Sequence, residues 1–352
     1  MSFVSPSSER AQEVLGCLEP LQRHFADGLN RLSVKDGDGR KLKPTRWLRD
    51  EGCHGGGHRL ECTATALLNR CSLNISTIHY DDLPQKRLSS ATALSCIVHP
   101  HNPAAPSMHM HISWTELRGQ EGGWRLMADL NPSMPDTTQT RRFNDALSAI
   151  FVETPQGTLD KALAQGDRYF SIPALNRRRG VVHAYLEQWR TDDPAADLRL
   201  AERFGRRIVD AYLLLVADAL KTTAVPDVAS FETQLAYHTL YLFQVLTLDR
   251  GTSSGLLVHQ QNDGGILGSL PNRVDPLLLA SWRASMPSPQ ELLLDRILEV
   301  LPPLSPATLT PAIRLKLAQA VRAHYKAHPE ALSLQARGDV LPPTVANHTE
   351  TA

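Results

Sequence analysis

The chain has 352 residues, 42% of them hydrophobic and 21% charged, so it can bury a large core in one big domain or two ordinary ones. Its 37 Lys and Arg residues balance 37 Asp and Glu residues, which excludes the basic surface typical of proteins that bind nucleic acids or anionic membranes. We therefore expect a small-molecule partner, with no nucleic acid and no membrane.

The five cysteines indicate the compartment. They are odd in number and include no Cys-x-x-Cys pair, so neither a disulfide framework nor a zinc ribbon is predicted. The N-terminal residues show no cationic segment followed by an apolar run, and no window has the length of a membrane span. We expect a soluble, untargeted protein of the cytoplasm.

The first third of the chain predicts one long helix and then strands. Residues 7–33 repeat Leu and Phe at helical spacing, Ser8 can cap the helix, and Pro20 is expected to kink or split it. A polar stretch follows. Alternating apolar residues then predict strands within 59–80, 91–99 and 108–117, arranged as an antiparallel meander.

The rest of the chain mixes helices and strands. Helical spacing predicts helices at 141–151, 159–166, 195–222, 275–301 and 310–328, and an apolar run predicts a strand at 180–189. Residues 241–260 predict a β-hairpin with Asp-Arg-Gly-Thr-Ser-Ser-Gly at its turn. The residues from 330 onward are expected to form a loose tail.

Histidines are concentrated in residues 99–111, His-Pro-His-Asn-Pro-Ala-Ala-Pro-Ser-Met-His-Met-His. Because strand side chains alternate, His99 and His101 are predicted on one face of a strand, and His109 and His111 on one face of the next. Imidazoles in such pairs suit a polar ligand or a metal such as iron, copper or zinc.

Six ordered blocks resemble the oxygen-dependent coproporphyrinogen III oxidases. Trp-Leu-Arg-Asp-Glu-Gly-Cys-His-Gly-Gly-Gly at 47–57 is similar to the family's Trp-x-Arg-x-Glu-Gly-Gly-Gly-Gly, and Asp-Arg-Gly-Thr-Ser-Ser-Gly-Leu at 249–256 resembles its Asp-Arg-Gly-Thr-x-Phe-Gly-Leu. The other blocks lie at 98–116, 122–132, 176–189 and 268–282. Blocks in the same order are hard to obtain by accident, although each alone is weak.

This resemblance implies an α+β fold with a large flat antiparallel β-sheet flanked by α-helices on both faces. It places that domain at 1–302 and leaves 303–352 as a helical C-terminal extension with a loose tail. It also implies a homodimer whose cleft holds a tetrapyrrole. The family decarboxylates two propionates of coproporphyrinogen III to vinyl groups, which forms protoporphyrinogen IX in haem biosynthesis. O2 is the co-substrate, and no metal or organic cofactor is required.

The resemblance also assigns site residues. It implies that Asp129 faces the pyrrole N–H groups, that His109 is the acid/base or oxygen-side histidine, and that Arg179 and Arg250 bind propionates. It further implies substrate-binding positions at Asn102, Ser107 and Asn131. On the residues alone, Asp129 could simply cap a turn, and Arg250 could fasten the expected hairpin through its neighbouring aspartate.

Several positions depart from the family pattern. Ala174 and Leu175 stand where the family has histidine and arginine, Ser113 stands where it has arginine, and the distal arginine of the hairpin is lost near Gln261 and Asn262. Two alternatives therefore stay open. One is an O2-dependent oxidase with a different substrate and a histidine-bound metal, for which the candidates are His99, His101, His109, His111 and His183. The other is a non-catalytic tetrapyrrole-binding paralogue.

Overall fold

The computed structural model describes residues 3–221, 226–338 and 344–348. Its centre is an antiparallel sheet in the order β1-β2-β3-β4-β5-β6-β9. The strands are β1 (Lys43–Leu48), β2 (Gly55–Thr63), β3 (Leu68–His79), β4 (Leu88–Pro100), β5 (Ser107–Leu117), β6 (Gly123–Asn131) and β9 (Val182–Trp189). Strands β2 to β5 form the predicted antiparallel meander, and β9 matches the strand predicted at 180–189. Strands β1 and β6 were not predicted.

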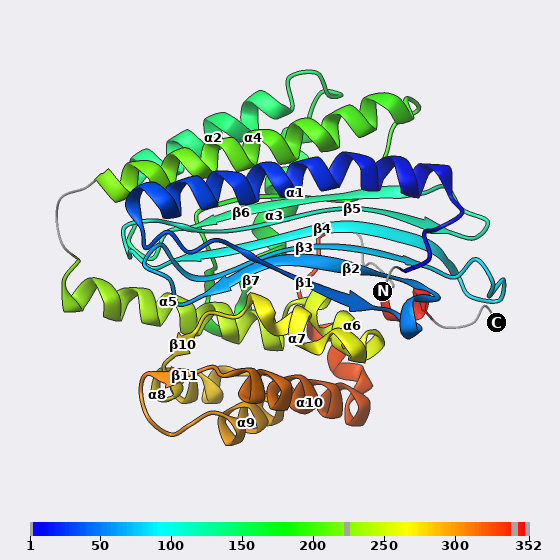
Figure 1. Ribbon diagram of the computed structural model, residues 1–352. Helices are drawn as coiled ribbons and strands as arrows, with labels where there is room; N and C mark the ends of the chain where they lie inside the picture. The colour runs from blue at the N-terminus through cyan, green and yellow to red at the C-terminus, as the bar shows by residue number, and fades with distance from the viewer. Residues whose placement is uncertain (1–2, 222–225, 339–343, 349–352) are drawn as a thin grey trace.

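Helices cover both faces of this sheet, as Figure 1 shows. The helices above it in that view are α1 (Glu9–Asp36), α2 (Thr137–Ile150) and α4 (Pro194–Lys221). Those below it are α5 (Val228–Thr247), α6 (Arg250–Val258), α7 (Asp263–Ile266), α8 (Pro276–Ser281), α9 (Gln290–Val300) and α10 (Pro311–Ala327). The predicted α+β class, with helices on both faces of a large antiparallel sheet, is confirmed.

Short elements connect these layers. Helix α3 (Thr158–Tyr169) packs against β9. The others are η1 (Asp50–Gly52), β7 (Ser171–Ile172), η2 (Pro173–Leu175), β8 (Arg177–Arg178), η3 (Gln260–Asn262), η4 (Leu267–Ser269), β10 (Arg273–Val274), η5 (Arg283–Ser285), β11 (Ala307–Thr308), η6 (Pro329–Leu334) and α11 (Thr344–Asn347). No helix among the described residues is both long enough and apolar enough to cross a membrane.

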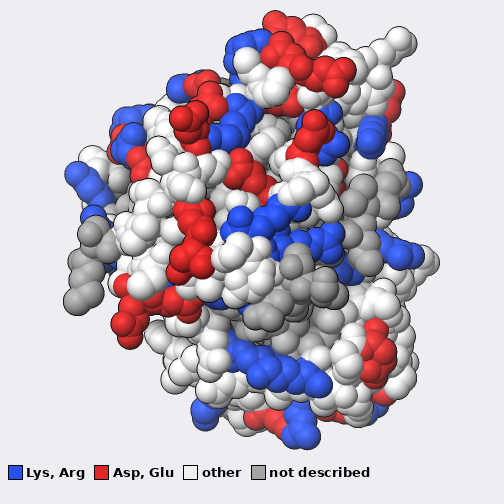
Figure 2. All heavy atoms as spheres, turned by 90° about the vertical axis from the view of Figure 1, so that its right-hand side faces the viewer, with Lys and Arg blue, Asp and Glu red and all other residues white. Residues whose placement is uncertain are grey.

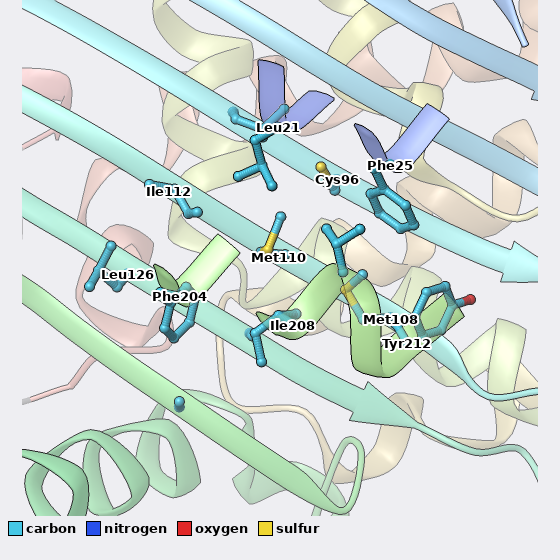
Figure 3. Close-up of a cluster of buried hydrophobic side chains, with 14 of the residues drawn as sticks. Leu21, Phe25, Cys96, Met108, Met110, Ile112, Leu126, Phe204, Ile208 and Tyr212 are labelled. Carbon is cyan, nitrogen blue, oxygen red and sulfur yellow. The ribbon is translucent and has the colours of Figure 1, made fainter. Parts of the chain in front are cut away.

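The sheet has one apolar face and one polar face because strand side chains alternate. On the face beneath α1 and α4, Figure 3 shows aliphatic, aromatic and sulfur-bearing side chains from strands and helices in one cluster. Its labelled members are Leu21, Phe25, Cys96, Met108, Met110, Ile112, Leu126, Phe204, Ile208 and Tyr212. Burial of this face holds the long helices on the sheet and leaves the opposite face, which we call the cavity face, for polar groups.

The predicted hairpin at 241–260 is wrong. Residues 228–247 form α5, which begins at the N-cap Asp227, and Asp249 caps α6 by accepting a hydrogen bond from Thr252 N–H. Residues 238–247 of α5 are all buried between the sheet and the outer helices. A helix that is apolar on every side has no helical period to detect, so the run resembled a strand.

Two further segments differ from expectation. The polar stretch before residue 45 leads directly into strand β1, and Gly55, Gly56 and Gly57 form the start of β2. At Gly57 a Cβ would lie 2.1 Å from the Ile75 carbonyl oxygen and under 3 Å from the Trp47 ring, so only glycine allows this close approach. Helix α1 is continuous through Pro20, so the predicted split does not occur.

The C-terminal region packs onto the rest of the protein. Helix α10 shares one hydrophobic cluster with α5 and α9, and the predicted helix at 275–301 divides into α8 and α9. Residues 344–348, expected in a loose tail, are ordered: His348 Nδ1 lies 2.9 Å from the Tyr80 hydroxyl. The remaining tail positions 339–343 and 349–352 lie outside the described residues.

Candidate active site

A cavity of about 290 Å³ lies between the cavity face and α5 and α6. The sheet contributes His109, His111 and Ser113 from β5 and Arg125 from β6. Arg179 also lines it, together with residues of α5, α6, η3 and the C-terminal His348. Outside the cavity, the molecular face in Figure 2 carries acidic and basic side chains interspersed, in agreement with the balanced composition.

Strand register explains why polar groups gather here. His109 of β5 lies opposite Asp129 of β6, and Asp129 lies opposite His183 of β9. Cross-strand partners point to the same face, so all three side chains are on the cavity face. The residues between them along each strand point to α1 and α4 and are apolar.

Asp129 is the centre of a buried group of polar side chains, which we call the Asp129 cluster, with Arg179, Asn131 and His109. Its Oδ2 accepts hydrogen bonds from Arg179 Nη2 (2.8 Å) and Asn131 Nδ2 (2.5 Å), and its Oδ1 lies 3.2 Å from His109 Nδ1. Asp129 is fully buried and lies behind its neighbours His109 and Arg179, which themselves line the cavity. The sequence-predicted Asp129, His109, Arg179 and Asn131 thus come together.

The electrostatics of this cluster keep Asp129 ionised. Burial by itself raises the pKa of Asp129, but the Arg179 guanidinium and the His109 ring outweigh it, so the pKa lies well below its ordinary value. Burial likewise lowers the pKa of Arg179, and the Asp129 carboxylate more than reverses this. The Arg179 guanidinium also sits 4.8 Å from the ring centres of Phe170 and Tyr241.

Ser107 and His99 form a second buried pair, beside α5. His99 Nε2 lies 3.2 Å from the Ser269 carbonyl oxygen and must donate to it, so Nδ1 accepts a hydrogen bond from the Ser107 hydroxyl (3.0 Å). Burial lowers the pKa of His99 well below its usual value, with His238 adding to the effect. These residues hold a loop against the sheet, behind the cavity lining.

Asn102 and Arg250 lie outside the cavity lining. Asn102 Oδ1 accepts a hydrogen bond from Ala104 N–H (2.9 Å), which closes the turn between β4 and β5. Arg250 is the first residue of α6, and its Nη2 donates to the Leu332 carbonyl oxygen (3.1 Å). In the structure Arg250 ties the C-terminal region to α6.

The five candidate metal ligands do not converge. His101 is exposed beyond the end of β4, against the Phe231 ring, so the expected His99 and His101 pair on one strand face is wrong. His111 Nδ1 is 2.7 Å from the Ser95 hydroxyl, and His183 Nε2 donates to the Arg179 carbonyl oxygen (2.5 Å). Within the described ranges, no three His, Cys, Asp or Glu side chains are grouped so as to hold a metal ion.

The chain matches known proteins over the region that contains the site residues. Residues 14–294 match the family model described as coproporphyrinogen III oxidase. This chain belongs to the coproporphyrinogen III oxidase family. The match covers β1 to β9 and ends within α9, close to the boundary expected at 302.

Individual relatives are distant in sequence. The oxygen-dependent coproporphyrinogen-III oxidase of Prochlorococcus marinus (strain AS9601) is 25% identical over 301 residues, which cover 76% of this chain and 85% of that protein. The mitochondrial oxygen-dependent coproporphyrinogen-III oxidase of Homo sapiens is 26% identical over 292 residues, covering 77% and 62%. At about 25% identity, individual site residues can differ between members of the family, so the role of each one depends on its own contacts in this structure.

The sequence did not predict a second polar cluster, which lies at the other end of the cavity. We call it the Arg125 cluster; it consists of Arg125, Glu187, Tyr185, Tyr169 and Asp249. Arg125 Nε donates to Glu187 Oε2 (2.5 Å), and the Tyr185 hydroxyl donates to the same oxygen (2.5 Å). The Tyr169 ring stacks on Tyr185, with its hydroxyl donating to Asp249 (2.7 Å). The one sequence signal was an arginine among the otherwise uncharged residues that precede Asp129 in β6.

Proposed function

We propose that the protein uses O2 to decarboxylate two propionates of coproporphyrinogen III to vinyl groups, which forms protoporphyrinogen IX in haem biosynthesis. The observation that carries this proposal is the Asp129 cluster on the wall of the cavity in a chain that belongs to the oxidase family. The cluster offers an anion, a guanidinium and an imidazole within one small volume.

The chemistry asks little of the protein beyond positioning. Each step converts one propionate, one O2 and one proton into a vinyl group, CO2 and H2O2. Two electrons from the ring reduce O2. The ring regains two electrons when the propionate side chain loses CO2 and the equivalent of a hydride ion. The pyrrole is electron-rich, so it can react with O2 once its N–H is polarised. We place His109, on the cavity wall, as the group that moves this proton.

Asp129 supplies the negative charge for this arrangement. Because its carboxylate lies behind His109 and Arg179, we place its charge one layer below the ring, where it stabilises positive charge on the pyrrole nitrogens and on His109. Arg179, which lines the cavity, binds a propionate. Ser107, Asn131 and Asn102 then act by holding the strands and the turn around this centre.

The test is aerobic incubation of the purified protein with coproporphyrinogen III. Mass analysis should resolve a product that has lost two CO2, with two O2 consumed per substrate. Activity should persist after strong chelation, because the family reaction needs only O2. Tight binding without turnover would instead favour a tetrapyrrole-binding paralogue, and activity restored by one particular metal would favour the metal-dependent alternative.

We also propose that the protein is a cytoplasmic homodimer. In each copy, residues 1–302 are the oxidase-like domain and residues 303–352 are a C-terminal extension. Strand β1 forms one edge of the sheet, and an open edge can pair with a second copy. All five cysteines are free, which suits a reducing compartment. Light scattering of the full chain, and of a chain ending at 302, would test the dimer and the independence of the first region.

A further inference from the structure

Arg125 lies where an arginine is missing from the family pattern. Ser113 on β5 stands at a position where the family has arginine, and the register places Arg125 of β6 directly opposite Ser113. Both side chains line the cavity. The stretch of β6 that contains Arg125 resembles a glycine-rich run of the family pattern, so that pattern places no arginine there.

A β-bulge aims the partners of Arg125 at the cavity. On β9 the register shifts between the pairs with Trp124 and Leu126, so Glu187 and Gln188 together oppose Arg125. Gln188 has a φ of 51°, an uncommon value for a residue other than glycine. Bulges of this kind redirect side chains and are frequent next to active sites. Glu187 faces the cavity by alternation with His183 and Tyr185, and the bulge lets the adjacent Gln188 line it as well.

The contacts of Arg125 leave one end of its guanidinium available. Its Nε is fixed by Glu187, whose side chain is only 2% exposed and is held by the Tyr185 hydroxyl. Its Nη1 and Nη2 make no hydrogen bond to the part of the chain that the structure describes, and its side chain remains 20% exposed. Burial lowers the pKa of Arg125, but Glu187 outweighs this, so the charge is secure.

The position of Arg125 suits a ligand that also reaches the Asp129 cluster. Arg125 and Asp129 are four residues apart on one strand and face the same side, which separates their backbones by about 13 Å at about 3.3 Å per residue. His111 lies between them, opposite Met127. A tetrapyrrole lying over His109 and His111 would therefore place a peripheral group near Arg125.

We propose that Arg125, oriented by Glu187, is a carboxylate-binding subsite that replaces the guanidinium missing at position 113. The inference rests on the proposed function for the identity of the ligand, a tetrapyrrole with propionate side chains. An arginine whose terminal N–H groups point into a cavity forms the two parallel hydrogen bonds that a carboxylate accepts. The subsite would fix the end of the substrate that lies away from the reacting propionate.

The experiment measures binding of coproporphyrin III, the oxidised and unreactive form of the substrate, by fluorescence titration. Replacing Arg125 alone would leave Glu187 buried without its partner and could unfold the protein, so the main variant is Arg125→Gln with Glu187→Gln. We expect this pair to weaken binding ten- to a hundredfold, the usual effect of losing hydrogen bonds between charged groups. Binding of the uncharged tetramethyl ester should not change between the two proteins.

A matched control removes an ion pair of the same type elsewhere. Arg283 of η5 and Asp295 of α9 form a two-pronged pair, and neither residue lines the cavity. Arg283→Gln with Asp295→Asn should therefore leave binding of coproporphyrin III unchanged. A rescue variant completes the set. Adding Ser113→Arg to the Arg125→Gln, Glu187→Gln protein should raise its affinity for coproporphyrin III at least tenfold.

The outcomes separate the subsite from the proposed reaction. If the wild type binds coproporphyrin III and the folded Arg125→Gln, Glu187→Gln protein binds it equally well, the subsite is overturned while the proposed reaction stands. If the pair of substitutions weakens binding but the wild type shows no turnover, the subsite is supported and the reaction is overturned. No binding by the wild type overturns both, and failure of the rescue overturns the exchange between positions 113 and 125. In a turnover assay the pair should raise KM far more than it lowers kcat.

Discussion

Asp129 Oδ2 and Arg179 Nη2 lie 2.8 Å apart in a salt bridge whose side chains are 0% and 3% exposed, although 50 residues separate them in the chain. The pair joins β6 to the loop that precedes β9, which backbone hydrogen bonds from Arg179 N–H to the Phe170 carbonyl oxygen and from Val181 N–H to the Leu130 carbonyl oxygen also hold in place. Breaking such a pair leaves one charge buried and alone.

Asp129→Asn should therefore cost stability as well as activity. We expect a loss of about 3–5 kcal/mol in the free energy of unfolding, because Arg179 would remain buried without a carboxylate. Urea denaturation followed by circular dichroism measures this loss. Asp218→Asn, which breaks an exposed pair with Arg142, should cost at most about 1 kcal/mol. Equal losses in the two variants would mean that the Asp129 carboxylate is not needed to hold Arg179.

His109→Gln should lower kcat by about 10²- to 10⁴-fold with little change in KM, because a proton-transfer group acts in the transition state and contributes little to binding. His111→Gln is the matched comparison, since His111 is on the same strand face and its Nδ1 meets the Ser95 hydroxyl instead of a carboxylate. We expect its loss of kcat to be much smaller. Similar losses from both substitutions would argue against a distinct role for His109.

Buried histidines predict how stability depends on pH. His238 in α5 is buried, its Nε2 has no hydrogen-bond partner in the described structure, and burial lowers its pKa to about 3. The unfolded chain binds a proton below a pH of about 6.5, while the folded protein does not until about 3, so stability falls as the pH drops through this window. His238 alone should lower the free energy of unfolding by about 2 kcal/mol when the pH falls from 7.5 to 5.

His238→Leu tests this directly. The substitution removes the titrating group and an unpaired buried nitrogen, so the variant should lose less stability than the wild type between pH 7.5 and pH 5. Urea denaturation at both pH values gives the two differences. The same pH dependence in both proteins would show that His238 is already charged or reaches solvent in the folded state.

The strands were predictable because one face of the sheet is apolar and the other polar, which gives β4 and β5 a clear period of two. Helix α5 was not predictable in this way. It is buried on all sides at its C-terminal half, so its sequence carries no period, and Tyr241 to Leu248 read as a strand. Strand β1 was missed because it is short and only one of its side chains is buried.

The site was predictable where residues share a strand or face each other across two strands. His109 and Asp129 are opposite one another, so sequence blocks that align on the family place both. The Arg125 cluster depends on a bulge in β9 and on the packing of α3, and neither has a local sequence signature. Arg250 was expected at a hairpin turn, and because that turn is a helix start, its side chain takes a different direction.

Arg250→Ala is therefore expected to act mainly on stability. Arg250 donates to the Leu332 carbonyl oxygen in η6, and its stem is packed beneath the C-terminal region, outside the residues that line the cavity. Losing this contact should lower the free energy of unfolding by about 1–3 kcal/mol, since the bond comes from a charged donor. The melting temperature reports this loss, and KM for coproporphyrinogen III should change less than it does after loss of Arg125.

A chain that ends at residue 328 separates the two possible roles of Arg250. This truncation removes Leu332, whose carbonyl oxygen accepts the hydrogen bond from Arg250. If that contact is the main role of Arg250, Arg250→Ala should hardly change the free energy of unfolding of the truncated protein. If Arg250 instead turns toward a propionate when substrate binds, Arg250→Ala will raise KM by a similar factor in the full and the truncated chains. A large rise in KM in both would replace the structural role with the substrate-binding one that the family resemblance implied.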